Sequence, residues 1–158
     1  MKTKTIRISS RFPAPIDVIW EKLQQVETLQ YIAAPYATFK SVGDTPLVWT
    51  EGETIQFSLK LFGLFCLGVH SILVKQFVKE KHTIYTTESN KYVPVWNHRI
   101  VLKPTYDYLV TEYTDEVEVF AGWKTSIVAA WSRMFYKHRQ KKWLALLHDS
   151  KMFSEKEI

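Results

Sequence analysis

The stretch that decides the fold is TEYTDEVEVFAGWKTSIVAAWSRMFYKHRQKKW, residues 111–143. Up to Val119, apolar and polar side chains alternate, which is the period of a half-buried strand. After Gly122 the apolar spacing becomes helical and stays so to about Leu147. At 1.5 Å per residue such a helix is roughly 35 Å long, enough to cross one face of a curled sheet. The sequence therefore predicts a strand followed by a long helix.

The predicted helix has one face for the sheet and one basic face. The residues expected to follow the inward spacing are Ile127, Trp131, Met134, Phe135, His138 and Lys142. The basic residues of the segment, which contains no acid, are Lys124, Arg133, Lys137, Arg139, Lys141 and Lys142. This segment holds the whole net charge of +5. We interpret it as a solvated outer face; the alternatives are weak contact with an anionic membrane surface, or salt-sensitive nucleic-acid binding without sequence specificity.

Working back along the chain, the pattern is one strand, two short helices and a meander. Residues 5–12 alternate as a strand, Ile16–Leu23 has helical spacing, and a second helix is expected around Thr28–Ile32. From Thr38 to Val119 strand follows strand, separated by turn residues. The sequence therefore predicts an α+β fold, in which a curled antiparallel sheet of about seven strands wraps around the long C-terminal helix.

Length and composition indicate a single globular domain. The chain has 158 residues, 46% hydrophobic and 23% charged, which excludes disordered and fibrous classes. We expect the domain to span residues 1–148, followed by a polar tail at 149–158. Cys66 is the only cysteine, which excludes an internal disulfide, and no apolar leader or membrane-spanning run is visible, so we expect a cytoplasmic protein.

Aromatic residues are more numerous than a core of this size requires. They make up 15% of the chain, including six Trp, and many fall on the inward faces of the predicted strands and helix. Ordinary core packing is one interpretation, and the wall of a ligand cavity is the other. The candidate cavity residues are Trp49, Phe57, Leu59, Phe62, Phe65, His70, Trp96, His98, Ile100, Tyr113, Asp115, Trp131, Phe135 and His138.

Three polar residues fall on the inward faces of the last two predicted strands. If those strands form a hairpin with both dry faces together, His98 lies opposite Tyr113 or Asp115. A buried carboxylate needs partners, and a histidine beside it is one. The three could therefore serve as general acid–base groups, with Tyr136 and His138 arriving from the helix. The alternative is a structural His–Asp pair that does not react.

No motif for a cofactor or a metal is recognisable. The glycines are too dispersed for a phosphate loop, and the histidines are not at metal-ligand spacing, with only His98 and His138 expected as neighbours. We therefore predict no cofactor and no metal.

The segment FGLFCL, residues 62–67, is apolar where a soluble hairpin normally carries polar turn residues. Folded over a cavity mouth it would be a lid, and exposed it would be a membrane or partner contact. A third interpretation is a longer strand pair whose turn is tucked against the long helix. Cys66 within it is interpreted as an apolar filler.

Several segments together resemble the START-like, or SRPBCC, superfamily, often labelled polyketide cyclase/dehydrase-like. They are APIDVIW at 14–20, LFG at 61–63, WNH at 96–98, TDEVE at 114–118 and FYKHRQKKW at 135–143. The resemblance implies the helix-grip fold with a deep apolar cavity between sheet and helix. It also implies binding of a hydrophobic or aromatic small molecule, lipid-like or polyketide-like. Two alternatives are a cyclase- or dehydratase-like enzyme using His98, Asp115 and Tyr113, and a peripheral membrane protein.

Overall fold

The computed structural model describes residues 1–156, and their side chains to Asp149. The predicted helix-grip fold is confirmed: one antiparallel sheet of seven strands has the order β1-β7-β6-β5-β4-β3-β2. In chain order the elements are β1 (Lys4–Phe12), α1 (Ile16–Leu23), α2 (Val26–Ala33), β2 (Ala37–Ser41), β3 (Thr54–Leu61), β4 (Phe65–Val78), the 3-10 turn η1 (Lys79–Lys81), β5 (Thr83–Ser89), β6 (Val95–Pro104), β7 (Thr111–Phe120) and α3 (Thr125–Lys156).

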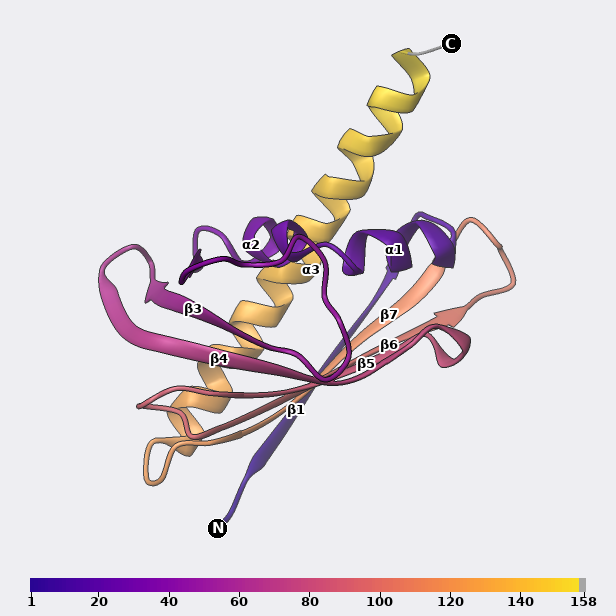
Figure 1. Ribbon diagram of the computed structural model, residues 1–158. Helices are drawn as coiled ribbons and strands as arrows, with labels where there is room; N and C mark the ends of the chain where they lie inside the picture. Colours follow the sequence, from indigo (N-terminus) through magenta and orange to yellow (C-terminus); the bar gives the residue numbers. More distant parts are fainter. Residues whose placement is uncertain (157–158) are drawn as a thin grey trace.

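Helix α3 crosses one face of the sheet and continues past its edge, and α1 and α2 lie on the same side of the sheet, with α2 in contact with α3 (Figure 1). The helix runs beyond residue 148, where we place the end of the domain. Side chains from residue 150 on lie outside the described part of the chain. The polar tail at 149–158 therefore stays a prediction.

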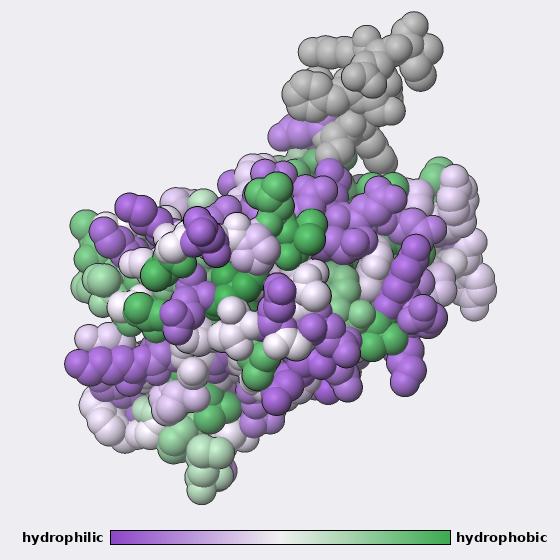
Figure 2. Space-filling model, in the orientation of Figure 1, coloured by the Kyte–Doolittle hydropathy of each residue, from purple (hydrophilic) through white to green (hydrophobic). Residues whose placement is uncertain are grey.

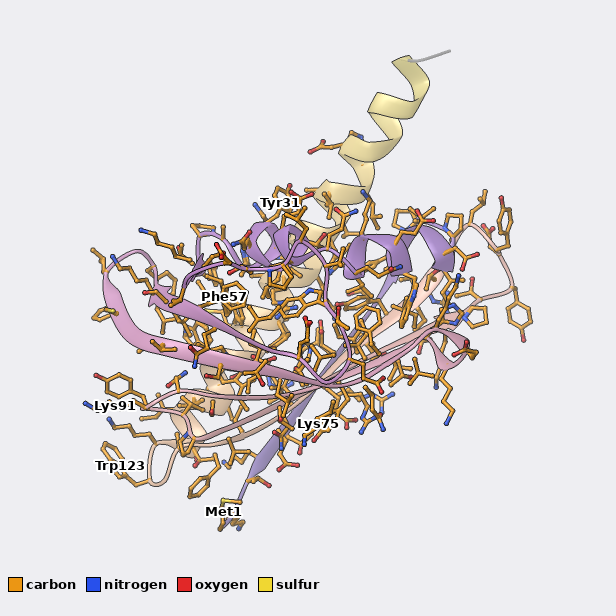
Figure 3. All side chains as sticks on the ribbon, viewed as in Figure 1. Met1, Tyr31, Phe57, Lys75, Lys91 and Trp123 are labelled. Carbon is orange, nitrogen blue, oxygen red and sulfur yellow. The ribbon has the colours of Figure 1, made fainter. Side chains whose placement is uncertain are left out.

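The sheet has a dry concave face because its strands alternate. In β3, Ile55, Phe57 and Leu59 are buried between more exposed neighbours. Figure 3 shows side chains filling the space between sheet and helix, with Phe57 on this side and Lys75 on the opposite side. The pairing shifts at Leu59/Lys60, and such a bulge bends and twists a strand, which helps the sheet curl around α3.

The buried residues form two clusters, one along each half of α3. The first contains Phe57, Trp96 and Phe135. The second lies under α1 and contains Phe12 and Trp143 among others. The first cluster borders a cavity beside the helix.

The predicted inward face of α3 is wrong at Ile127 and Met134, which are exposed, and at His138, which lies on the outer side of the helix. Ile127 and Met134 are 65% and 44% exposed. The buried face is Ala129, Ser132, Phe135, Tyr136, Arg139, Gln140, Trp143 and Leu147. This face packs on the sheet, and two of its polar side chains are bonded: the Ser132 hydroxyl donates to the Val128 carbonyl at 2.7 Å, and Gln140 Nε2 donates to Ile8 and Asp115. Arg139, which we assigned to the solvated basic face, is buried.

The inward-facing residues of β6 and β7 pair with one another, as predicted, but the register of the two strands differs from the prediction. His98 lies opposite Val117, and Asp115 lies opposite Ile100. The expected alignment of His98 opposite Tyr113 or Asp115 is therefore wrong. The reason is the connection: β7 begins at Thr111, after a loop in which the Thr105 hydroxyl donates to the Val110 carbonyl at 2.8 Å. His98 and Asp115 become diagonal neighbours on the same face.

Candidate functional site

A cavity of about 280 Å³ lies between the sheet and the first half of α3. Its wall is mostly apolar, which favours apolar ligands, and its volume is near the lower end of the range for small-molecule sites. Five of the predicted cavity residues line it: Leu59, His70, Trp96, Trp131 and Phe135. Tyr92, Lys124 and Ile127 line it too and are exposed, so they mark its mouth.

A smaller cavity of about 60 Å³ adjoins the first one. The predicted residues Trp49, His98 and Ile100 line it. Leu29, Glu88 and Arg139 belong to the walls of both cavities, so these three side chains form the partition between them.

The remaining predicted residues lie elsewhere. Phe57 is fully buried behind the wall, and Tyr113 and Asp115 are buried as well. His138 does not meet His98: its Nε2 donates to the Ala34 carbonyl at 2.8 Å, and its ring stacks on Tyr36. Their expected proximity is wrong, because His138 faces a groove on the outer side of α3.

The predicted contact between His98 and Asp115 is formed. His98 Nε2 donates to Asp115 Oδ1 at 2.6 Å, and both residues are buried. Gln140 Nε2 donates to Asp115 Oδ2 at 3.0 Å and also to the Ile8 carbonyl. Both carboxylate oxygens are therefore occupied, and β1, β6, β7 and α3 are joined at one point. The His98 ring packs against Tyr136, with ring centroids 4.9 Å apart, as expected for a residue arriving from the helix.

The geometry gives Tyr113 no part in this cluster. Within the part of the chain that the structure describes, its hydroxyl is buried without a hydrogen-bond partner, and its ring packs between Phe12 and Trp143. Burial, assisted by the charge of Asp115, raises the pKa of the Tyr113 phenol well above its ordinary value. Neither Tyr113 nor Asp115 lines either of the two cavities. A substrate bound in them would therefore not contact two of the three residues of the acid–base hypothesis.

A second buried network, not foreseen as a unit, joins β4 and β5. His70 Nε2 donates to Glu88 Oε2 at 2.8 Å, and the Thr86 hydroxyl donates to Glu88 Oε1 at 2.7 Å. Asn90 Nδ2 donates to His70 Nδ1 at 3.0 Å, while Asn90 Oδ1 accepts from the backbone of Tyr92 and Val93. The loop after β5 thus fixes the imidazole, which in turn holds the carboxylate at the cavity wall.

The pKa of Glu88 is lowered by this network. Burial alone would raise it, but the hydrogen bond from His70, the attraction of His70 and His98 and the bond from Thr86 outweigh burial. A carboxyl whose folded pKa lies below its unfolded value stabilises the fold above that unfolded value, 4.5, and this stability is lost as the pH falls further.

We therefore expect His70→Phe to lower the free energy of unfolding by about 1–3 kcal/mol at neutral pH, since it leaves the buried carboxylate without its main donor. The difference from wild type should shrink as the pH falls below 4.5 and Glu88 is protonated. Urea unfolding over a pH series measures this. In a Glu88→Gln background the same change should show no such pH dependence, and an equal dependence in both backgrounds would contradict the assignment.

Arg139 is the residue of the site that the sequence interpretation missed. It is 5% exposed, and it lies four residues from both Phe135 and Trp143, which is the spacing of the buried face. Its guanidinium carbon lies 4.7 Å from the Tyr136 ring centroid. The spacing from Phe135 and Trp143 could have predicted that Arg139 is buried. We assigned Arg139 to the solvated face because basic residues surround it in the sequence.

The apolar hairpin tip is exposed rather than folded over the cavity. Phe62, Leu64 and Phe65 are 44%, 81% and 63% exposed, and Leu61 and Leu67 at its base line the cavity. Hydrophobic side chains gather at this end of the molecule, at the left of Figure 2. The lid interpretation is not supported, and contact with a membrane or partner stays a prediction.

Within the described residues, no three His, Cys, Asp or Glu side chains lie close enough together to hold a metal ion. No helix of the described chain combines the length and the apolar character needed to cross a membrane.

Comparison with solved structures identifies the fold. A START superfamily protein from Mycobacterium smegmatis superposes with a TM-score of 0.68 at 10% identity, covering 92% of this chain and 97% of that one. Protein MLL2253 from Mesorhizobium loti gives 0.70 at 16% identity, covering 92% and 98%. Ara h 8.0201 gives 0.61 at 12% identity, covering 91% and 99%. No family model matches the chain, and no curated protein matches its sequence.

The fold is that of the START-like helix-grip proteins. The resemblance noted in the sequence is thus confirmed at the level of the fold.

Proposed function

We propose that this protein binds a hydrophobic small molecule in the cavity between the sheet and α3. The observation that carries the proposal is the cavity of about 280 Å³ itself, with a mostly apolar wall and an open mouth. An apolar space of this size without a ligand forfeits packing contacts that a well-filled core would make. A cavity of this kind beside α3 is therefore suited to binding a hydrophobic ligand. A cytoplasmic location is part of the same proposal.

We propose a binding function and not a catalytic one because of the positions of His98 and Asp115. Asp115 has both oxygens engaged by His98 and Gln140, and it is not among the residues that line the two cavities. A general base must reach the proton it removes, and the cavity that His98 lines, of about 60 Å³, is much smaller than the proposed ligand site. The His98–Asp115 contact is accounted for as a structural pair.

The expected result is saturable binding of a neutral apolar probe. N-phenylnaphthylamine should bind the native protein at a single site with a dissociation constant of about 10 μM or below, detected as enhanced fluorescence. Decanol, which is uncharged, should displace it. Absence of saturable binding, or fluorescence that persists in an excess of both decanol and decanoate, would contradict the proposal.

A further inference from the structure

Arg139 is a buried cation without a partner. Among the described residues its side chain forms neither a hydrogen bond nor an ion pair, and its Nε is buried without an acceptor. A buried, unpaired charge is costly, and a guanidinium carries five donors in a fixed fork. Its ring contacts with Phe135 and Tyr136 provide no hydrogen-bond acceptor oxygen.

The neighbouring carboxylates do not fill this role. Each oxygen of Glu88 and of Asp115 already accepts a hydrogen bond, from His70, Thr86, His98 and Gln140 respectively. These carboxylates act on Arg139 only through space. Burial would lower the pKa of Arg139, but the attraction of neighbouring groups, including the charged carboxylates of Asp115 and Glu88, outweighs burial and raises it, so the guanidinium remains charged.

A second donor lies beside the guanidinium. The Tyr136 hydroxyl accepts a hydrogen bond from Trp96 Nε1 at 3.0 Å, which leaves its own proton without a protein acceptor among the described residues. Burial raises the pKa of Tyr136, so this phenol stays protonated. Both Tyr136 and Arg139 line the larger cavity.

We infer that the ligand of this cavity is an apolar carboxylate whose head group pairs with the Arg139 guanidinium. The inference rests on the proposed function, because it names the chemical class of the guest. A carboxylate matches the planar fork of arginine and supplies the acceptors that the site lacks.

The placement of the lining residues orients this ligand. On α3, Ile127 marks the mouth, and Arg139 lies about 18 Å further along the helix, at 1.5 Å per residue. Trp131 and Phe135 line the helix side of the cavity between them. The carboxylate therefore lies at the inner end, and the apolar tail points towards the mouth.

The test compares two ligands that differ only in the head group. At neutral pH, wild-type protein should bind decanoate about ten- to hundredfold more tightly than decanol, measured by displacement of N-phenylnaphthylamine. Arg139→Met should remove this preference while still binding decanol. Arg133→Met, which removes an exposed guanidinium from the same helix, should leave the preference unchanged.

The outcomes separate the two claims. If neither ligand displaces the probe, the proposed function fails and this inference with it; if both bind wild type equally well, only the inference is overturned. Should Arg139→Met not fold, wild type still decides through nitrogen NMR. The Arg139 Nε–H resonance should shift on addition of decanoate and not of decanol, and no difference between them would overturn the pairing.

Discussion

Trp143→Ala is expected to lower the free energy of unfolding by about 3–5 kcal/mol, the usual cost of removing a large buried aromatic side chain. Trp143 is fully buried in the second cluster, where its ring lies 5.8 Å from that of Phe12 and 5.7 Å from that of Tyr113. These rings tie the C-terminal half of α3 to β1 and β7. Urea unfolding of wild type and variant measures the loss.

Trp123→Ala is the matched control, because Trp123 is 83% exposed. The same change of residue there should alter the free energy of unfolding by no more than about 0.5 kcal/mol. Trp143→Phe should fall between the two. A loss below about 1 kcal/mol for Trp143→Ala would contradict the packing described for the second cluster.

Asp115→Ala is expected to cost about 3–5 kcal/mol, because it breaks a buried pair and leaves its partners behind. His98 Nε2 and Gln140 Nε2 both lose their acceptor, and the side chain is 1% exposed, so water does not readily replace it. Thermal or urea unfolding at neutral pH measures this change.

Asp115→Asn separates the lost charge and hydrogen bond from the lost volume. The amide keeps the shape and one oxygen acceptor, so the loss should be smaller, about 1–3 kcal/mol. In a Gln140→Met background the cost of Asp115→Ala should decrease, since one of the orphaned donors is gone. Equal costs in both backgrounds would contradict the shared network.

The architecture was predictable because periodicity determines which face of a strand is buried. The alternation in β6 and β7 was sufficient to place His98 and Asp115 on one face and in contact. Their register was not predictable, because it depends on a loop whose shape is set by bonds of Thr105 and Asp107. A register shift of two residues keeps the same side chains on the inward face, but it changes which residue lies opposite His98.

The polar groups of the cavity wall were only partly predictable. His70 was a candidate, but its partner Glu88 lies on another strand, and only the β4–β5 pairing brings them together. Arg139 was assigned to the outer face because basic residues surround it in sequence. Arg139 is buried because it lies on the face of α3 that packs on the sheet. The apolar residues Ile127 and Met134 predicted a different face, but both are exposed.

The most direct test of the central claim compares probe binding in two variants of α3. Val128 lines the larger cavity, whereas Ala130 is exposed two residues further along. Val128→Trp should fill the cavity and weaken N-phenylnaphthylamine binding by about tenfold or more, while Ala130→Trp, which also adds an indole, should bind like wild type. With both variants shown to be folded by circular dichroism, equal affinity in the two would mean that the ligand site lies elsewhere.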